Sequence, residues 1–313
     1  GVYFIIIGLF KKAVISDYIS LNFVDRIFDN AMLYSGLENL LGVYGYAMQI
    51  YCDFSGYSDV AIGMALWLGF KIPPNFLSPY QSSSITEFWR RWHISLSSWL
   101  KDYLYIPLGG NRNATFASYL FVVLFLVGSF MMCSHLFGWS YLISGIVTCG
   151  LLLIFVLPPL LGKNPKGIAA NFNLLTTMLL GGFWHGASWN FIIWGAIHGV
   201  GLGIHKIWML LTDKSFAAFN QSRIYKIISG ILTFHFVCFA WIFFKAEDLE
   251  IAKEMIYQIF NNFDISVFGP FYDNYKGVVW MILAAMVLHL IPDNLADKVI
   301  ARTKTIPMVI YIL

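Results

Sequence analysis

Long apolar runs, separated by short polar or basic stretches, make up most of this chain. The runs that predict membrane-spanning helices cover residues 40–70, 116–133, 139–161, 174–209, 227–244 and 278–291, and partial spans lie at residues 2–10 and at the C-terminal end. A helix needs about 20 apolar residues to cross a bilayer, so we expect roughly seven or eight membrane segments. Because backbone groups at membrane depth must hydrogen-bond within the protein, the pattern predicts an all-α helical bundle.

Composition supports a single membrane domain over residues 1–313. Of the 313 residues, 58% are hydrophobic and only 12% are charged, whereas soluble domains carry about 25% charged residues. The net charge of +3 is too small to suggest a nucleic-acid partner. Because the chain begins with Gly and ends inside an apolar run, we expect a fragment that lacks N-terminal and C-terminal spans. The 4 cysteines form no CxxC pair, and we interpret them as small core residues.

Residues 78–110 differ from the spans on either side. They are rich in Trp, Tyr and Arg and too polar to cross a membrane, which predicts short helices that lie at the surface or enter the protein part-way, with Thr86 as a helix cap. Arg90 and Arg91 belong to the densest basic cluster. They fit a positive-inside topology signal or, alternatively, a mouth that binds a phosphate-bearing donor. We expect His93, beside them, to be an interface residue rather than a base.

One histidine, His185, is the strongest candidate for chemistry. It lies in segment 181–190, among glycine, tryptophan and phenylalanine residues, inside a predicted span. An ionisable side chain at membrane depth usually faces the protein interior or a wet cavity. Burial disfavours the charged imidazolium, so we expect a neutral ring that can accept a proton from a hydroxyl or a thiol. The alternative is a structural histidine that bridges two helices through hydrogen bonds.

A second histidine, His198, follows in the same predicted span. On a continuous helix the two histidines lie about 220° apart around the axis and about 20 Å apart along it. They can therefore share a site only if the helix breaks, and Gly195 is the candidate position. Gly195 and Gly199 also have the spacing of small residues that pack helices together. We interpret His198, and His205 beyond it, mainly as structural.

Gln49, Asp53 and Tyr57 recur at intervals that place them on one helix face. A carboxylate inside a span needs a partner or water. Asp53 could orient a histidine, bind a substrate hydroxyl or cap a helix that is broken at Gly56. A purely structural network is the alternative.

Three motifs resemble those of the membrane-bound O-acyltransferase family, and in particular its AlgI-like branch of bacterial alginate O-acetylation proteins. They are QIYCDFSGYSD at residues 49–59, EFWRRWHISLSSWLKDYLYIPLGG at 87–110 and GGFWHGASWNFIIWGAIHG at 181–199. The resemblance implies a helical bundle with re-entrant or interfacial helices around a central tunnel, and His185 as the catalytic histidine. The candidate substrate-binding or supporting groups are then Asp53, Tyr57, Trp184, Asn190 and His198, with Arg90 and Arg91 on the donor side.

The resemblance also implies a function. Such a protein transfers an acetyl group from acetyl-coenzyme A to a secreted or cell-surface polysaccharide, and it lies in the cytoplasmic (inner) membrane with several spans. Its expected partners are membrane lipid, the polysaccharide acceptor and an extracytoplasmic acetyltransferase or other modification protein, while no metal or bound cofactor is expected. Two alternatives remain. One is a transporter or channel in which His185 and Asp53 form a proton path, and the other is a non-catalytic scaffold of a polysaccharide export machine.

Overall fold

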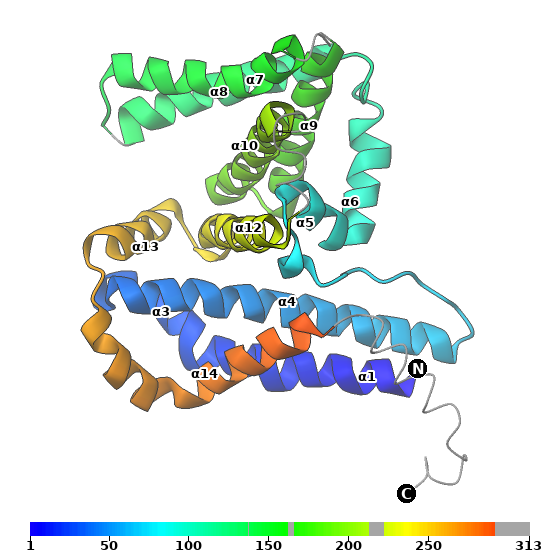
Figure 1. The fold of residues 1–313 in the computed structure, drawn as a ribbon, viewed down its shortest axis with the longest axis vertical. Coiled ribbons are helices and arrows are strands. Elements are labelled where there is room, and N and C mark those ends of the chain that lie inside the picture. Colours follow the sequence, from blue (N-terminus) through cyan, green and yellow to red (C-terminus); the bar gives the residue numbers. More distant parts are fainter. Residues whose placement is uncertain (137, 162–165, 213–221, 292–313) are drawn as a thin grey trace, which may run out of the picture.

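The computed structural model describes residues 1–136, 138–161, 166–212 and 222–291, and these residues form helices without any strand (Figure 1). The first helices are α1 (Val2–Leu9), α2 (Asp17–Ile19), α3 (Asp25–Asp29) and α4 (Gly36–Trp67), with π-helical turns at Phe10–Ser16 and Ser20–Val24. Next come α5 (Ile85–Arg91), α6 (Ile94–Leu100), α7 (Phe116–Met131), α8 (Tyr141–Leu161), α9 (Lys166–His185) and α10 (Trp189–Thr212). The last are α12 (Arg223–Lys245), α13 (Leu249–Asn261) and α14 (Phe268–Leu290). The predicted all-α class is confirmed for this part of the chain.

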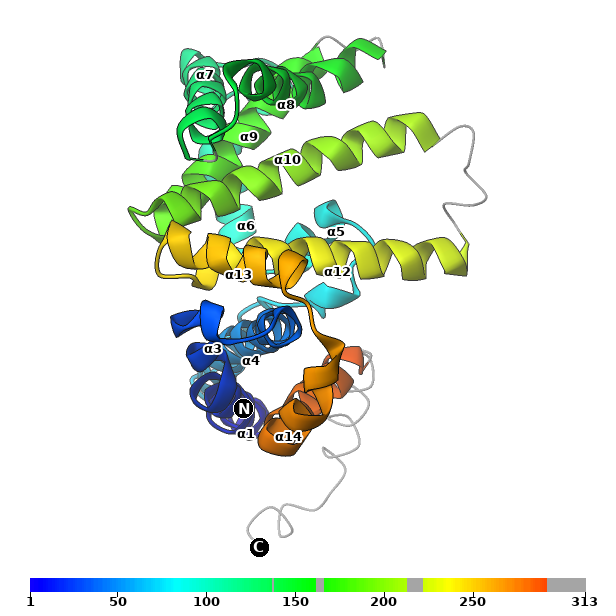
Figure 2. The same ribbon diagram turned by 90° about the vertical axis from the view of Figure 1, so that its left-hand side faces the viewer.

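The helices are stacked in layers that can be followed in two perpendicular views (Figures 1 and 2). α7 and α8 lie at one end, α9 and α10 beside them, α12 and α13 in the middle, and α1, α4 and α14 at the other end. A continuous buried core that includes Phe88, Trp194 and Trp241 extends through the middle layers. Residues from α5, α10 and α12, far apart in the sequence, therefore pack against one another.

α4 is one unbroken helix of 32 residues. It begins at a capping box, in which the Ser35 hydroxyl accepts a hydrogen bond from the Glu38 N–H and the Glu38 carboxylate accepts one from the Ser35 N–H. α4 continues through Gly56, so the alternative in which Asp53 caps a helix broken there is wrong. Gly56 lies against Gly8 of α1, and a Cβ atom on either glycine would overlap the carbonyl oxygen of the other. Gly56 is therefore a helix-packing residue.

Two helices in the described ranges are long and apolar enough to cross a membrane, Phe116–His135 and Arg223–Lys245, and Tyr141–Leu157 is a shorter apolar helix. The other predicted spans are helical there but do not meet both conditions, and α4, for example, is long enough at 32 residues but not apolar enough. Residues 245–275, which lie between two of the predicted spans, contain α13. This helix buries Ala252 and Met255 and exposes Phe260. Its amphipathic pattern, rather than a long apolar run, marks it as a helix.

The span predicted over residues 174–209 is two helices and not one. α9 ends at His185, residues 186–188 turn the chain, and α10 packs along α9 (Figure 2). Gly182 and Gly195 face each other across the pair, and a Cβ atom on either would lie 3.3 Å from the Cα atom of the other. Gly195 is thus a contact between the helices and not the site of the break, which lies at the Gly186 turn.

Candidate active site

Side chains from four parts of the chain enclose a cavity of about 50 Å³. Its lining comprises Ile50 and Phe54 from α4, Trp89, Trp92, His93 and Leu96 from the α5–α6 region, His185 and Trp194 from the α9–α10 pair, and Trp241 and Phe244 from α12. All of these are aliphatic or aromatic apart from the two imidazoles. Because about 10–15 Å³ is enough to hold one water, the cavity has room for a group of only a few heavy atoms.

His185 reaches the cavity from the last position of α9 and is half-buried. Its ring makes edge-to-face contacts with Trp194, at 5.2 Å between ring centroids, and with Phe244, at 5.0 Å. Within the described part of the chain no hydrogen bond to this ring is formed, so aromatic packing alone orients it. Both ring nitrogens therefore remain available to a substrate.

His93 reaches the same cavity from the junction of α5 and α6. Its backbone lies in the left-handed region, with φ of 43° and ψ of 58°. Such a conformation is rare for a residue with a side chain and is found preferentially at functional sites. The two short helices are joined by this turn, and the turn aims the imidazole at the cavity lining.

The tautomer of His93 follows from its partners. Nδ1 lies 3.3 Å from Asn75 Oδ1, which also accepts hydrogen bonds from the Ser95 N–H at 3.0 Å and the Ser95 hydroxyl at 2.9 Å. Because an amide oxygen only accepts, Nδ1 carries the proton and Nε2 carries the lone pair. Burial, and next the charge that His185 would carry, lower the pKa of His93 from 6.5 to about 4. The ring is therefore neutral at physiological pH and can accept a proton at Nε2.

The sequence pattern did not predict this pairing, because His93 was expected to be an interface residue. The available signal was the position of His93 inside the second motif, between two tryptophans and a serine-rich stretch. Only the tertiary contact between the α5–α6 turn and the α9–α10 pair brings the two histidines to one cavity.

Two indole N–H groups of the cavity lining have no acceptor. Trp89 Nε1 and Trp194 Nε1 are buried, and neither has a hydrogen-bond partner within the described ranges. A buried donor without an acceptor costs about 1–3 kcal/mol. By contrast, the indole of Trp241 donates to the Tyr80 hydroxyl at 3.2 Å. Trp89 and Trp194 line the cavity, and neither indole N–H is committed to an acceptor in the described part of the chain.

Three of the predicted supporting residues do not belong to the cavity lining, and of these Trp184 contacts His185. Trp184 contacts the His185 ring at 4.9 Å between centroids but is 58% exposed. Asn190 is buried, and its Nδ2 donates to the Ala246 carbonyl at 2.9 Å, which ties the start of α10 to the end of α12. His198 is fully buried against Trp194, with a centroid distance of 4.8 Å.

Asp53 and Tyr57 lie on α4 but outside the cavity lining. The Asp53 carboxylate forms an ion pair with Lys12 at 2.6 Å, and the Tyr57 side chain is 69% exposed. The structure therefore supplies Asp53 with a partner from the turn after α1, and it does not bring Asp53 and His185 together in the described chain.

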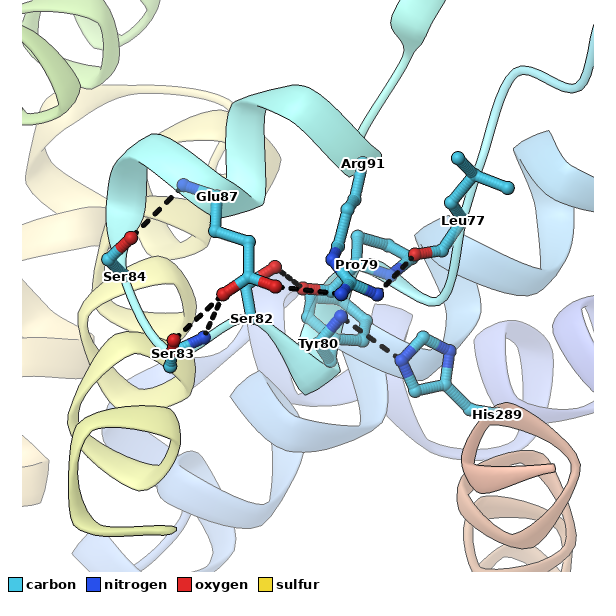
Figure 3. A network of polar contacts seen from close by, with 9 residues as sticks. All are labelled: Leu77, Pro79, Tyr80, Ser82, Ser83, Ser84, Glu87, Arg91 and His289. Atoms are coloured by element: carbon cyan, nitrogen blue, oxygen red, sulfur yellow. Dashed lines mark hydrogen bonds and ion pairs between the residues drawn. The ribbon is translucent and has the colours of Figure 1, made fainter. Parts of the chain in front are cut away.

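Arg90 and Arg91 differ in environment. Arg90 is exposed, whereas Arg91 pairs with Glu87 at 2.7 Å and donates to the Leu77 carbonyl at 3.2 Å (Figure 3). Burial alone would raise the pKa of Glu87, but hydrogen bonds from Ser83 and the charge of Arg91 outweigh it and leave that pKa below its ordinary value. Arg91 is thus part of a network that fixes α5.

The cap of α5 also differs from the sequence expectation. Ser84, not Thr86, is the N-cap, and its hydroxyl accepts from the Glu87 N–H at 3.1 Å. Thr86 lies inside the first turn, where its hydroxyl contacts His205 Nδ1 at 3.0 Å. That contact links α5 to α10.

Known proteins resemble this chain along most of its length. Residues 1–157 match the membrane-bound O-acyltransferase family. A peptidoglycan O-acetyltransferase of Helicobacter pylori is 37% identical over 256 residues, which is 82% of this chain and 38% of that protein. A probable alginate O-acetylase of Pseudomonas aeruginosa is 37% identical over 254 residues, or 81% of this chain and 37% of that protein. A teichoic acid D-alanyltransferase of Bacillus subtilis is 29% identical over 248 residues, or 79% of this chain and 51% of that protein.

The region matched by these relatives includes both histidines of the cavity lining. A match that covers 81% of a chain of 313 residues must include its middle, and hence both His93 and His185. The chain itself spans between about 37% and 51% of the length of these relatives.

Proposed function

This chain belongs to the membrane-bound O-acyltransferase family, and on that premise we propose that it forms the acyl-transfer part of an enzyme that O-acetylates a secreted or cell-surface polysaccharide. The relatives named for peptidoglycan and alginate O-acetylation support this class of acceptor. The observation that carries the proposal is the small aromatic cavity with two imidazoles on its wall. Its volume suits a short acyl group such as acetyl and leaves no room for a long fatty-acyl chain.

The reaction begins with a proton transfer. A neutral His185 takes the proton of the acceptor hydroxyl, and the hydroxyl oxygen attacks the carbonyl carbon of an acetyl thioester. The tetrahedral intermediate then collapses with cleavage of the C–S bond. The leaving thiolate takes the proton back from His185, so that an O-acetyl ester and a free thiol are formed.

Other groups of the cavity lining assist this step. The unpaired indole N–H groups of Trp89 and Trp194 donate to the oxygen that becomes negative in the tetrahedral intermediate, as oxyanion-hole donors do. His93, with its lone pair at Nε2, is the second base of the cavity and holds either the acceptor hydroxyl or the imidazolium of His185. Trp184 packs on the His185 ring, His198 packs on Trp194 of the cavity lining, and Asn190 holds the start of α10 to the end of α12.

The proposal also covers the acetyl donor and the membrane in which the enzyme lies. The donor is acetyl-coenzyme A, and exposed Arg90 is available to bind its phosphates, whereas Arg91 is held by Glu87. The enzyme lies in the cytoplasmic membrane with several spans, and the hydroxyl that attacks belongs to the polysaccharide or to an extracytoplasmic partner that passes the acetyl group on.

A transfer assay tests the proposal. The whole protein, of which this chain is a part, is reconstituted into vesicles with radiolabelled acetyl-coenzyme A, and acetylation of the polysaccharide fraction is measured. We expect His185→Ala to lower transfer by about 10²–10⁴-fold while the protein still inserts and keeps its thermal stability. An undiminished rate of acetylation by a folded His185→Ala variant would overturn the catalytic role of this residue.

A further inference from the structure

A second and larger hollow has Tyr80 in its lining and shares no lining residue with the histidine cavity. It has a volume of about 420 Å³ and lies between α12, α4, α14 and the short helix Pro79–Gln81. We call it the α12 groove. Its volume is within the range of about 300–1,000 Å³ that small-molecule sites occupy. Neither histidine of the proposed active site belongs to its lining.

The α12 groove is polar at one end and apolar along its length. Arg223 and Lys226 lie at the first turn of α12, and Ile227, Ile231 and Phe234 continue the wall along the same helix. The positions from Arg223 to Phe234 span about 16 Å at 1.5 Å per residue. A ligand that follows this wall therefore has a head near two cations and an apolar tail of roughly that length.

Gly230 has no side chain to fill the α12 groove at its position in the wall. It lies one turn after Lys226, on the same helix face, and a Cβ atom there would meet only the Ser82 carbonyl oxygen, at 3.8 Å. A larger side chain at this position would enter the groove without first overlapping the backbone of a neighbouring helix.

Neither cation has a counter-charge among the residues that the structure describes, because no acidic side chain there pairs with Arg223 or Lys226. α12 is one of the two helices that are long and apolar enough to cross a membrane, and both cations lie at its end, where headgroups are found. Basic residues at this depth attract anionic lipid headgroups.

The wall also contains a polar group without a partner. His289 is 4% exposed, and its Nε2 accepts a hydrogen bond from the Tyr80 N–H at 3.0 Å (Figure 3). Nδ1 must therefore carry the ring proton, and it has no acceptor within the described ranges. A ligand with an oxygen atom next to its apolar tail supplies such an acceptor.

We propose that the α12 groove binds one anionic phospholipid. Its phosphate lies between Arg223 and Lys226, and one acyl chain follows the wall past Gly230. The bound chain packs against Tyr80, whose hydroxyl donates to the Ala47 carbonyl at 2.8 Å and accepts from Trp241 of the histidine cavity. The lipid thus packs on a residue that is hydrogen-bonded to the lining of the histidine cavity, and its binding does not depend on the reaction proposed above.

Lipid binding is measured directly. The whole protein is purified, stripped of lipid and titrated with phosphatidylglycerol or phosphatidylcholine while bound lipid is counted by native mass spectrometry. We expect phosphatidylglycerol to bind more tightly, and Arg223→Gln and Lys226→Gln to weaken it about fivefold each. Gly230→Leu, which keeps both cations, should abolish binding by filling the groove. Removal of the same charge elsewhere, in Lys101→Gln and Arg112→Gln, should have no effect.

Three results would overturn the proposal. They are equal binding of the two lipids, unchanged binding in Arg223→Gln and Lys226→Gln, and displacement of the lipid by millimolar inorganic phosphate alone, which would indicate a plain anion site. Thermal unfolding of each variant, without lipid, shows whether it is folded. If Gly230→Leu fails to fold, Gly230→Val takes its place, and binding by a folded Gly230→Val at wild-type strength counts against the groove.

Discussion

His93 and His185 line one cavity, although one belongs to the turn between two short helices and the other ends a long helix far along the chain. Their environments differ. Asn75 fixes the tautomer of His93 through Nδ1, whereas aromatic rings alone hold His185. The cavity thus contains one imidazole with a fixed lone pair and one that is free to exchange a proton with a substrate.

Replacement of either histidine by alanine is expected to reduce acetyl transfer by about 10²–10⁴-fold, because proton transfer by a positioned side chain contributes about that factor. Asn75→Leu should give a smaller loss, since it frees His93 Nδ1 but leaves the ring in place. The measurement is the initial rate in the vesicle assay. Exposed His135 provides the control, and His135→Ala should keep the wild-type rate. A wild-type rate in folded His93→Ala would exclude His93 from the reaction.

Removal of a single indole N–H is expected to slow the chemical step with little effect on folding. Trp89→Phe and Trp194→Phe keep an aromatic ring but cannot donate to the developing oxyanion, and the loss of one such donor lowers kcat about 10²-fold. Separate determination of kcat and KM checks this. Trp241→Phe is the matched comparison, because its N–H is already bonded to Tyr80 and its loss should affect stability more than kcat. Equal kcat values in all three variants would argue against the donor role.

The contact between α9 and α10 is expected to exclude any side chain larger than hydrogen. Gly195→Ala places a Cβ atom against the Met178 carbonyl and the Gly182 backbone, and overpacking of this kind costs about 1–3 kcal/mol. Gly145→Ala in α8 meets no atom within 4 Å and should be neutral or stabilising. Thermal unfolding of the two variants in one detergent makes the comparison. The contact is not tight if both variants unfold at the wild-type temperature.

Acid is expected to destabilise the folded protein through His93. Its pKa is about 4 in the folded chain and about 6.5 in the unfolded chain. Between these values the unfolded state binds more protons, so this part of the stability is present above about pH 6.5 and is lost as the pH falls towards 4. Apparent Tm values from pH 7 to 4 should therefore fall less steeply in His93→Gln than in the wild type. Parallel curves would show that His93 does not titrate in this way.

Local sequence patterns were sufficient to predict those helices whose formation depends on interactions between residues close in the sequence. Long apolar runs predicted the helices that became α7, α8 and α12. The polar, aromatic segment before α7 became the short helices α5 and α6. The same patterns failed where a contact with a distant segment decides the outcome. Gly56 does not break α4, because Gly8 needs its small size for the approach of α1.

The sequence by itself determined the helical class and the family and made His185 the candidate base, because apolar length, motif order and an ionisable group in an apolar run can all be read from the order of residues. Only the tertiary structure decided that the chain turns at Gly186, that Asp53 forms an ion pair with Lys12, and that His93 lines the same cavity as His185. These outcomes depend on which helices can approach closely. That is a matter of side-chain volume at crossings such as Gly182 and Gly195, which no spacing in the sequence encodes.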